Sequence, residues 1–109
     1  MSGMGKHAPN WETGYIRRVV SAMLKAGYAI SVDNGGDEDE LAIAKSTSHT
    51  AITDELCHCE WEQLDCYDVD TGLYVGSAAI IWGESQRDDP SEVINDYHVS
   101  LEHIFDSVK

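Results

Sequence analysis

The residues of this chain with the clearest potential for chemistry are three cysteines and two histidines. Cys57, His58 and Cys59 are consecutive, and His49 and Cys66 lie nearby in the sequence. These side chains are common zinc ligands, but zinc sites usually take their four ligands from pairs spaced two to four residues apart. Cys57 and Cys59 are separated by only one residue, and no second Cys or His pair has the spacing of a zinc knuckle. We therefore interpret Cys66 as a small core side chain, and expect no metal and no other cofactor.

A second candidate, Asp68–Gly72, looks like the start of a calcium-binding loop. An EF-hand loop needs glycine at its sixth position and glutamate at its twelfth, where this chain has Leu73 and Ala79. We interpret the segment as a turn. The serines and histidines match no nucleophile motif, and Gly35-Gly36 precedes four acidic residues that would repel phosphate. The sequence thus predicts a protein that is not an enzyme.

The acidic residues are the strongest feature. Twenty Asp and Glu stand against seven Lys and Arg, giving a net charge of −13 over 109 residues. Residues 46–109 contain fourteen of those acids and, as bases, only Arg87 and Lys109. Such a surface repels nucleic acid and membranes and attracts basic proteins. We expect the carboxylates to gather on one exposed region, with no direct nucleic-acid binding and no membrane partner.

Hydrophobic periodicity predicts where the helices and strands lie. Apolar residues spaced three and four apart follow Asn10, the expected N-cap, and Gly27 should end that helix. Alternation at period two predicts strands, and Asp89-Pro90-Ser91-Glu92 has the pattern of a helix start. The expected elements are a helix between Asn10 and Gly27, strands at 28–32 and 41–45, a short helix at 50–57, strands at 60–68 and 73–82, and a helix from Asp89 that continues, after a break near His98, to the C-terminus.

This order, α-β-β-α-β-β-α, predicts an α+β fold with a four-stranded, mainly antiparallel sheet and helices on one face. Residues 1–9 form a flexible lead and residues 10–109 a single domain. The face beneath the helices should carry Ile30, Ile43, Leu64 and Ile81. The opposite face should carry Trp61, Tyr67, Tyr74 and Trp82.

Exposed aromatic rings among acids are typical anchors for a protein partner. The candidate partner-binding residues are Asp37, Glu38, Asp39, Glu40, Glu60, Trp61, Glu62, Asp65, Tyr67, Asp68 and Asp70. Two plainer interpretations stay open. The acids can serve solubility alone, and a homodimer partner can cover the aromatic residues.

Several strings resemble a group of small proteins encoded by tailed phages and prophages. They are Tyr15-Ile16-Arg17-Arg18, Ala26–Val32, Lys45-Ser46-Thr47, Trp82-Gly83 and Glu92–Tyr97. The resemblance implies a phage accessory protein working in the cytoplasm of a bacterial host. Three closely spaced cysteines and the lack of a signal sequence at the start of the chain also favour a cytoplasmic location.

Small acidic phage proteins often block host nucleases, restriction enzymes or CRISPR complexes. By analogy, we expect a protein-binding inhibitor of a host nucleic-acid-handling defence system, acting as an acidic DNA mimic on a basic nucleic-acid-binding host protein or complex. The alternatives are a phage assembly accessory that oligomerises through its sheet and, less favoured, a small Cys/His metalloprotein.

Overall fold

A computed structural model describes residues 8–33, 43–58, 60–83 and 85–108 of the chain. Within these ranges the fold is α+β, with a five-stranded antiparallel sheet and three α-helices. The elements are α1 (Asn10–Lys25), β1 (Tyr28–Asp33), β2 (Ile43–Ser46), α2 (His49–Asp54), β3 (Trp61–Asp68), β4 (Tyr74–Ile81), the 3-10 helix η1 (Pro90–Val93), β5 (Ile94–Tyr97), the 3-10 helix η2 (Val99–Leu101) and α3 (Glu102–Ser107).

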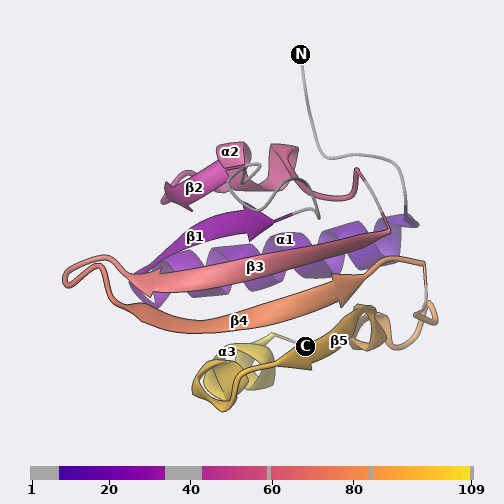
Figure 1. Cartoon of the computed structure of the whole chain (residues 1–109). Coiled ribbons are helices and arrows are strands. Elements are labelled where there is room, and N and C mark those ends of the chain that lie inside the picture. The colour runs from indigo at the N-terminus through magenta and orange to yellow at the C-terminus, as the bar shows by residue number, and fades with distance from the viewer. Residues whose placement is uncertain (1–7, 34–42, 59, 84, 109) are drawn as a thin grey trace.

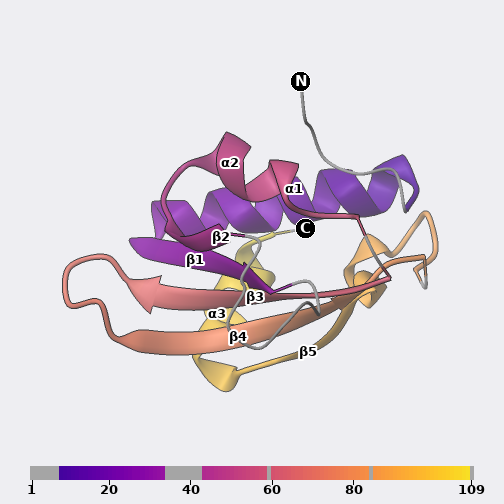
Figure 2. The same cartoon turned by 45° about the horizontal axis from the view of Figure 1, so that its top comes forward.

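The strands are arranged in the order β2-β1-β3-β4-β5, and every neighbouring pair is antiparallel (Figures 1 and 2). The longest pairing joins β3 to β4, from Trp61 opposite Ile81 to Tyr67 opposite Tyr74. On its other side β3 pairs with β1, with Val32 opposite Leu64. The two expected hairpins, β1–β2 and β3–β4, are therefore confirmed, and β3 lies at the centre of the sheet.

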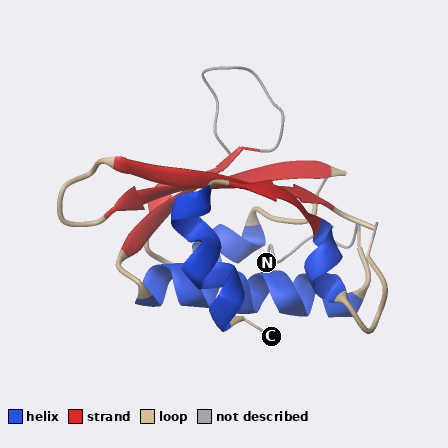
Figure 3. Cartoon of the chain, turned by 90° about the horizontal axis from the view of Figure 1, so that it is seen from below, coloured by secondary structure: helices blue, strands red, loops and turns tan. Residues whose placement is uncertain are grey.

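All three helices lie on one side of the sheet, as expected (Figure 3). The core fills the space between the helices and the sheet and contains apolar side chains from both. Its fully buried members include Ile16, Val19, Val20 and Met23 from α1, Ile30, Val32, Leu64, Cys66, Ala78 and Ile80 from the sheet, and Ile52, Leu56, Val93 and Leu101 from the connecting segments. This arrangement leaves the opposite side of the sheet without a helix over the described residues.

The first helix forms where its apolar periodicity placed it. Its cap differs from the expectation, because Asn10 is the first helical residue and Pro9, which has no side-chain cap, occupies the N-cap position. Gly27 follows the helix with a φ of +94°, a conformation that side chains oppose. At the second helix, Ser48 is the N-cap and its hydroxyl oxygen accepts a 3.2 Å hydrogen bond from the backbone N–H of Ala51.

The connecting segments agree with the turn chemistry where the structure describes them. In the β3–β4 turn, one carboxylate oxygen of Asp68 accepts hydrogen bonds from the backbone N–H groups of Asp70 (2.8 Å) and Thr71 (3.0 Å). Gly72 closes this turn with a φ of +74°. The β1–β2 connection at residues 34–42 and most of the expected lead at 1–9 lie outside the described residues.

The predicted helix after Asp89 is wrong over residues 94–97. The start signal produces a single 3-10 turn, and the chain then forms β5, which makes the sheet five-stranded rather than four-stranded. The free edge of β4 explains the difference. Its backbone groups need hydrogen-bond partners, and Ile94 and Tyr97 pair with Ile80 and Ala78 there. A helix that began at Asp89 and ended at the expected break near His98 would be short and would have little stability of its own.

The predicted faces are wrong at the end of β4. Trp82 is 2 % exposed and lies with Ile80 on the helix side, whereas Ile81 pairs with Trp61 on the opposite side. Residues 73–82 are apolar on both faces of the strand, so their sequence does not show which face the helices cover. Ile30, Ile43 and Leu64 pack with the core as expected.

None of the described helices is long and apolar enough to span a membrane.

Candidate functional site: the open face of the sheet

The side of the sheet opposite the helices, here called the open face, is covered by none of the described helices. Alternation along β3 and β4 decides which side chains it displays, except that a register shift after Cys66 brings Tyr74 opposite Tyr67 on this face. The displayed side chains are Trp61, Gln63, Asp65 and Tyr67 from β3, and Tyr74, Ser77, Ala79 and Ile81 from β4. On the neighbouring edge strand, Asp96 lies opposite Ala79 and adds a carboxylate.

A polar network occupies the middle of the open face. One carboxylate oxygen of Asp65 accepts hydrogen bonds from the side-chain amide of Gln63 at 2.7 Å and from the hydroxyl of Ser77 at 2.6 Å. The hydroxyl groups of Tyr74 and Ser77 are also hydrogen-bonded to each other. The network holds Asp65 and Tyr74 in fixed positions, which lowers the entropy lost when a partner covers them.

Aromatic rings and one lysine form the end of the open face near the β3–β4 turn. The rings of Tyr67 and Tyr74 meet edge to face with 5.7 Å between their centroids. The Lys45 ammonium lies 4.7 Å from the centroid of Tyr67, a cation–π distance. Burial raises the pKa of the Tyr67 hydroxyl, and the nearby Asp65 and Tyr74 raise it further.

The backbone of Lys45 is strained, and that strain supports its placement over Tyr67. Its φ of +44° is in the left-handed region, which non-glycine residues seldom adopt. The backbone N–H of Lys45 donates a 2.8 Å hydrogen bond to the hydroxyl oxygen of Ser31, which fixes this conformation. Backbone strain of this kind is concentrated at functional positions, so Lys45 belongs to the candidate site.

The other end of the open face is apolar. Trp61 is 37 % exposed and Ile81, its partner across the two strands, is half-buried. A large ring beside an aliphatic side chain offers a partner apolar area with few rotatable bonds. Together with Tyr74, which is 56 % exposed, Trp61 provides the aromatic anchors that the sequence predicted for this surface.

Glu62 is not on this surface. Its side chain points to the helix side and is completely buried, so its predicted role as a partner contact is wrong. One carboxylate oxygen accepts hydrogen bonds from the backbone N–H of Cys57 at 2.5 Å and the indole N–H of Trp82 at 2.6 Å. The other oxygen has no hydrogen-bond partner among the described residues. Burial raises the pKa of this carboxyl group, and the hydrogen bonds from Cys57 and Trp82 together with the backbone and charge of His58 oppose the rise.

A second buried carboxylate fixes the loop that follows β4. Glu12, on α1, is completely buried and accepts hydrogen bonds from the backbone N–H groups of Gly83 (2.6 Å) and Ser85 (3.0 Å) and from the Ser85 hydroxyl. Nearby, the guanidinium of Arg87 lies 5.3 Å from the centroid of the Trp11 ring. Glu12 and Glu62 thus anchor the described segments at the Trp61 end of the sheet.

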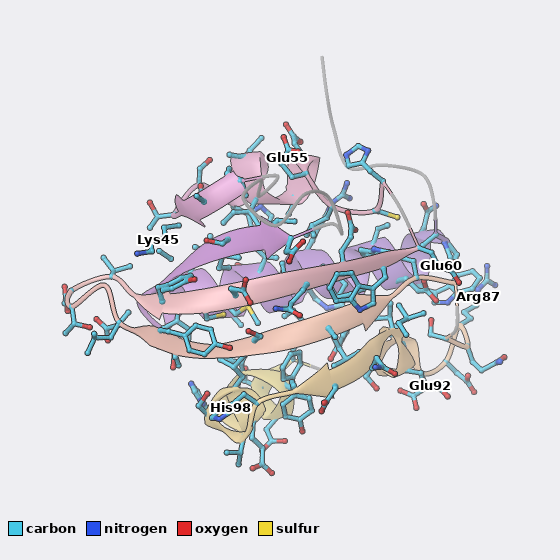
Figure 4. The ribbon with its side chains drawn as sticks, in the orientation of Figure 1. Lys45, Glu55, Glu60, Arg87, Glu92 and His98 are labelled. Atoms are coloured by element: carbon cyan, nitrogen blue, oxygen red, sulfur yellow. The ribbon has the colours of Figure 1, made fainter. Side chains whose placement is uncertain are left out.

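The acids of the described residues do not gather on one region. Figure 4 shows Glu55 just after α2, Glu60 just before β3 and Glu92 on η1, at separate places around the sheet. Among the predicted contacts, Glu60 and Asp70 are exposed at opposite ends of β3, Asp65 lies at the centre of the open face, and Asp68 is used in the turn. Asp37, Glu38, Asp39 and Glu40 lie outside the described residues. The described carboxylates therefore lie around the sheet instead of forming a single strip.

The cysteines and histidines do not converge in the described part of the chain. Cys66 is buried against Met23, with 3.6 Å between the two sulfur atoms, and burial raises its pKa to about 12. The imidazoles of His49 and His58 hydrogen-bond backbone oxygens elsewhere, and Cys59 lies outside the described residues. No three His, Cys, Asp or Glu residues among those described are close enough to hold a metal ion.

Sequence reasoning missed Lys45, Gln63 and Ser77 as members of the site. Gln63 could have been predicted, because it lies between the candidate residues Trp61 and Asp65 and alternation puts all three on one face of the strand. Lys45 was not, since its position over a tyrosine on another strand follows from the pairing of β1 with both β2 and β3.

Comparison with known proteins leaves the site to be interpreted from its own geometry: no family model, no curated protein and no solved structure matches this chain.

Proposed function

We propose that this protein is a non-enzymatic inhibitor that binds a basic, nucleic-acid-handling protein through the open face of its sheet. The observation that carries the proposal is the β3–β4 part of a sheet face, free of any covering helix among the described residues, that displays aromatic rings around a carboxylate network. In the phage context implied by the resemblance, the partner is a protein or complex of the bacterial host's defence system, bound in the host cytoplasm.

The aromatic residues supply the binding energy in this proposal. Trp and Tyr are enriched among the residues that dominate protein interfaces, because their rings bury much area and lose little entropy. Trp61 and Tyr74 lie at opposite ends of the face, with the Asp65 network between them. A partner that covers both rings would also cover Asp65 and Asp96, and therefore needs positive charge at its centre.

The net charge of −13 selects the class of partner. A negative field around the sheet accelerates association with basic proteins, and this acceleration weakens as salt is added. Because the described acids lie around the sheet, inhibition here means steric coverage of the partner's basic surface. It does not require carboxylates spaced like the phosphates of a duplex.

The proposal is tested by affinity capture from bacterial lysate at about 50 mM and about 500 mM salt, followed by mass spectrometry. We expect a nucleic-acid-binding protein that is retained at low salt and lost at high salt, and whose binding to DNA or RNA is blocked by this protein. Replacing Trp61 and Tyr74 with alanine should weaken the interaction at least tenfold, that is by about 1.4 kcal/mol or more.

The matched control replaces two other exposed apolar residues, Val69 and Leu73, which belong to the β3–β4 turn. This double alanine variant should bind like the wild type. The proposal fails when no nucleic-acid-binding protein is captured at low salt, or when both double variants lose binding equally.

Oligomerisation through the sheet is the second candidate function, and the adjacent Trp61 and Ile81 on the open face favour it. Two copies would, however, bring together two charges of −13 and place Asp65 and Asp96 near their equivalents. Light scattering separates the candidates. The assembly role predicts a stable oligomer indifferent to salt, whereas the inhibitor predicts a species of 12.0 kDa when purified alone.

A further inference from the structure

A groove on the helix side of the molecule, beside the edge strand β5, combines aromatic walls with acidic groups. Its volume is about 490 Å³, and residues of α1, η1, β5 and α3 line it. We call it the acidic aromatic groove. Its aromatic and acidic members are Tyr15, Tyr97, Phe105, Asp88, Asp89 and Asp106.

The aromatic members offer ring faces to an occupant. Tyr97 and Phe105 are in contact, with 4.6 Å between their centroids and a tilt of 43°. Tyr97 is 39 % exposed although it pairs within the sheet opposite Ala78. The face of an aromatic ring carries partial negative charge and attracts cations.

The carboxylates of the groove are not neutralised from within it. Asp88, Asp89 and Asp106 are exposed, and no Lys or Arg is among the described residues that line the groove. Asp89 accepts a hydrogen bond from the Ser91 hydroxyl at 2.5 Å, which fixes its carboxylate but leaves its charge. Three like charges around one cavity repel one another, and a bound cation relieves that repulsion.

The hydroxyl of a largely buried tyrosine provides an independent indication of a ligand. Tyr15 is 3 % exposed, lines the groove and, within the described chain, its hydroxyl makes no hydrogen bond. Burial raises the pKa of this hydroxyl, the Arg18 guanidinium 5.8 Å from the ring centroid lowers it, and Asp89 and Tyr97 raise it. The hydroxyl oxygen is not fully enclosed by the described residues, so it is open to the groove, where an occupant can supply a hydrogen-bond partner.

We propose that the acidic aromatic groove binds an arginine side chain presented by a basic protein or peptide. Arginine fits better than lysine, because a planar guanidinium stacks on Tyr97 and Phe105 while its N–H groups reach carboxylates in several directions. One of those N–H groups can donate to the oxygen of the Tyr15 hydroxyl. The cavity exceeds the volume of a single side chain, so residues flanking the arginine are accommodated too.

This proposal goes beyond the proposed function, since the groove lies on the helix side and needs no residue of the open face. A protein partner can therefore lose its contact with one surface and keep the other.

The probe is the peptide acetyl-Gly-Gly-Arg-Gly-Gly-amide, titrated into the full chain while NMR signals are followed. We expect saturable shifts at Tyr97 and Phe105. The same peptide with neutral citrulline in place of arginine should bind at least tenfold more weakly, and the lysine peptide a few-fold more weakly. The absence of a saturable shift up to about 10 mM peptide overturns the proposal, as does equal binding of the citrulline peptide.

Matched variants separate recognition from general attraction between charges. Asp106→Asn should weaken the arginine peptide about three- to tenfold, whereas Asp70→Asn, an equal change of charge at an exposed turn residue, should leave it within twofold. Tyr97→Leu should also weaken binding, and Tyr74→Leu on the open face should not. Equal losses for Asp106→Asn and Asp70→Asn would show attraction to net charge without a site.

The Trp61 and Tyr74 double alanine variant distinguishes the two proposals. It should bind the arginine peptide normally even when it no longer captures a protein partner.

Discussion

Removing the buried carboxylate of Glu62 gives the sharpest test of this structure. In Glu62→Ala, the backbone N–H of Cys57 and the indole N–H of Trp82 would remain buried and lose their acceptor. An unsatisfied buried donor costs about 1–3 kcal/mol. Relief from burying a charge returns part of that loss, because the second carboxylate oxygen has no partner among the described residues. We expect a net loss of about 3 kcal/mol from the free energy of unfolding.

The assay is urea denaturation followed by circular dichroism and by tryptophan fluorescence, since Trp82 contacts the altered site. The matched control is Glu60→Ala, the same truncation two residues earlier at an exposed position. We expect the control to change the free energy of unfolding by no more than about 0.5 kcal/mol. A total stability of about 5–15 kcal/mol is typical of a single domain, so the Glu62 variant should fold but denature at lower urea.

The result that would refute this reasoning is a loss below about 1 kcal/mol for Glu62→Ala, or one equal to that of Glu60→Ala. Either outcome would mean that Glu62 is exposed to solvent, as the sequence analysis assumed when it predicted Glu62 as a partner contact.

Three further predictions concern pH, packing and thiol reactivity. The folded-state pKa of Glu62 is raised above its ordinary value of 4.5, so the unfolded chain releases this proton at lower pH than the folded chain. The stability advantage of wild type over Glu62→Ala should therefore shrink as pH rises from 4.5 to the folded-state pKa, and then level off. Denaturation curves at several pH values measure this difference. Gly76→Ala should destabilise the protein by about 1–3 kcal/mol in thermal denaturation, because the added Cβ would lie 2.5 Å from the Ser100 hydroxyl oxygen and 2.9 Å from the Cβ of His98. A loss no greater than about 0.5 kcal/mol would show that η2 shifts freely. Cys66, whose pKa is raised to about 12, should resist alkylation at pH 8 until the protein is unfolded, and rapid labelling of the folded chain in a mass-spectrometric time course would contradict its burial.

Local signals in the sequence were sufficient for the first helix and for the two hairpins. The apolar stripe that follows Asn10 recurs at helical spacing, and Gly27 ends it for a reason confined to its own backbone. The β3–β4 hairpin follows from alternation on both strands and from the Asp68 turn between them. Each of these features depends on residues within a few positions of one another, which is why the sequence alone predicts them.

The parts of the candidate site that depend on distant residues were not available to that reasoning. Glu62 lies at the right period to be covered by the helices, but its charge suggested a surface position. Burial is tolerated because Trp82, which follows β4, and Cys57, which precedes β3, both donate hydrogen bonds to it. Those donors come together when the sheet forms.

The strand at residues 94–97 makes the same point for the fold. Its helix-start signal at Asp89 is genuine and produces one 3-10 turn, yet the free edge of β4 captures the next four residues because unpaired backbone groups there need partners. The sequence by itself determined the acidity of the protein, its α+β class and the elements built from local periodicity. The tertiary structure decided which face of each strand is covered, that the described acids lie around the sheet, and that Tyr15, Tyr97 and Phe105 line one groove, because pairing and packing join residues that periodicity cannot connect.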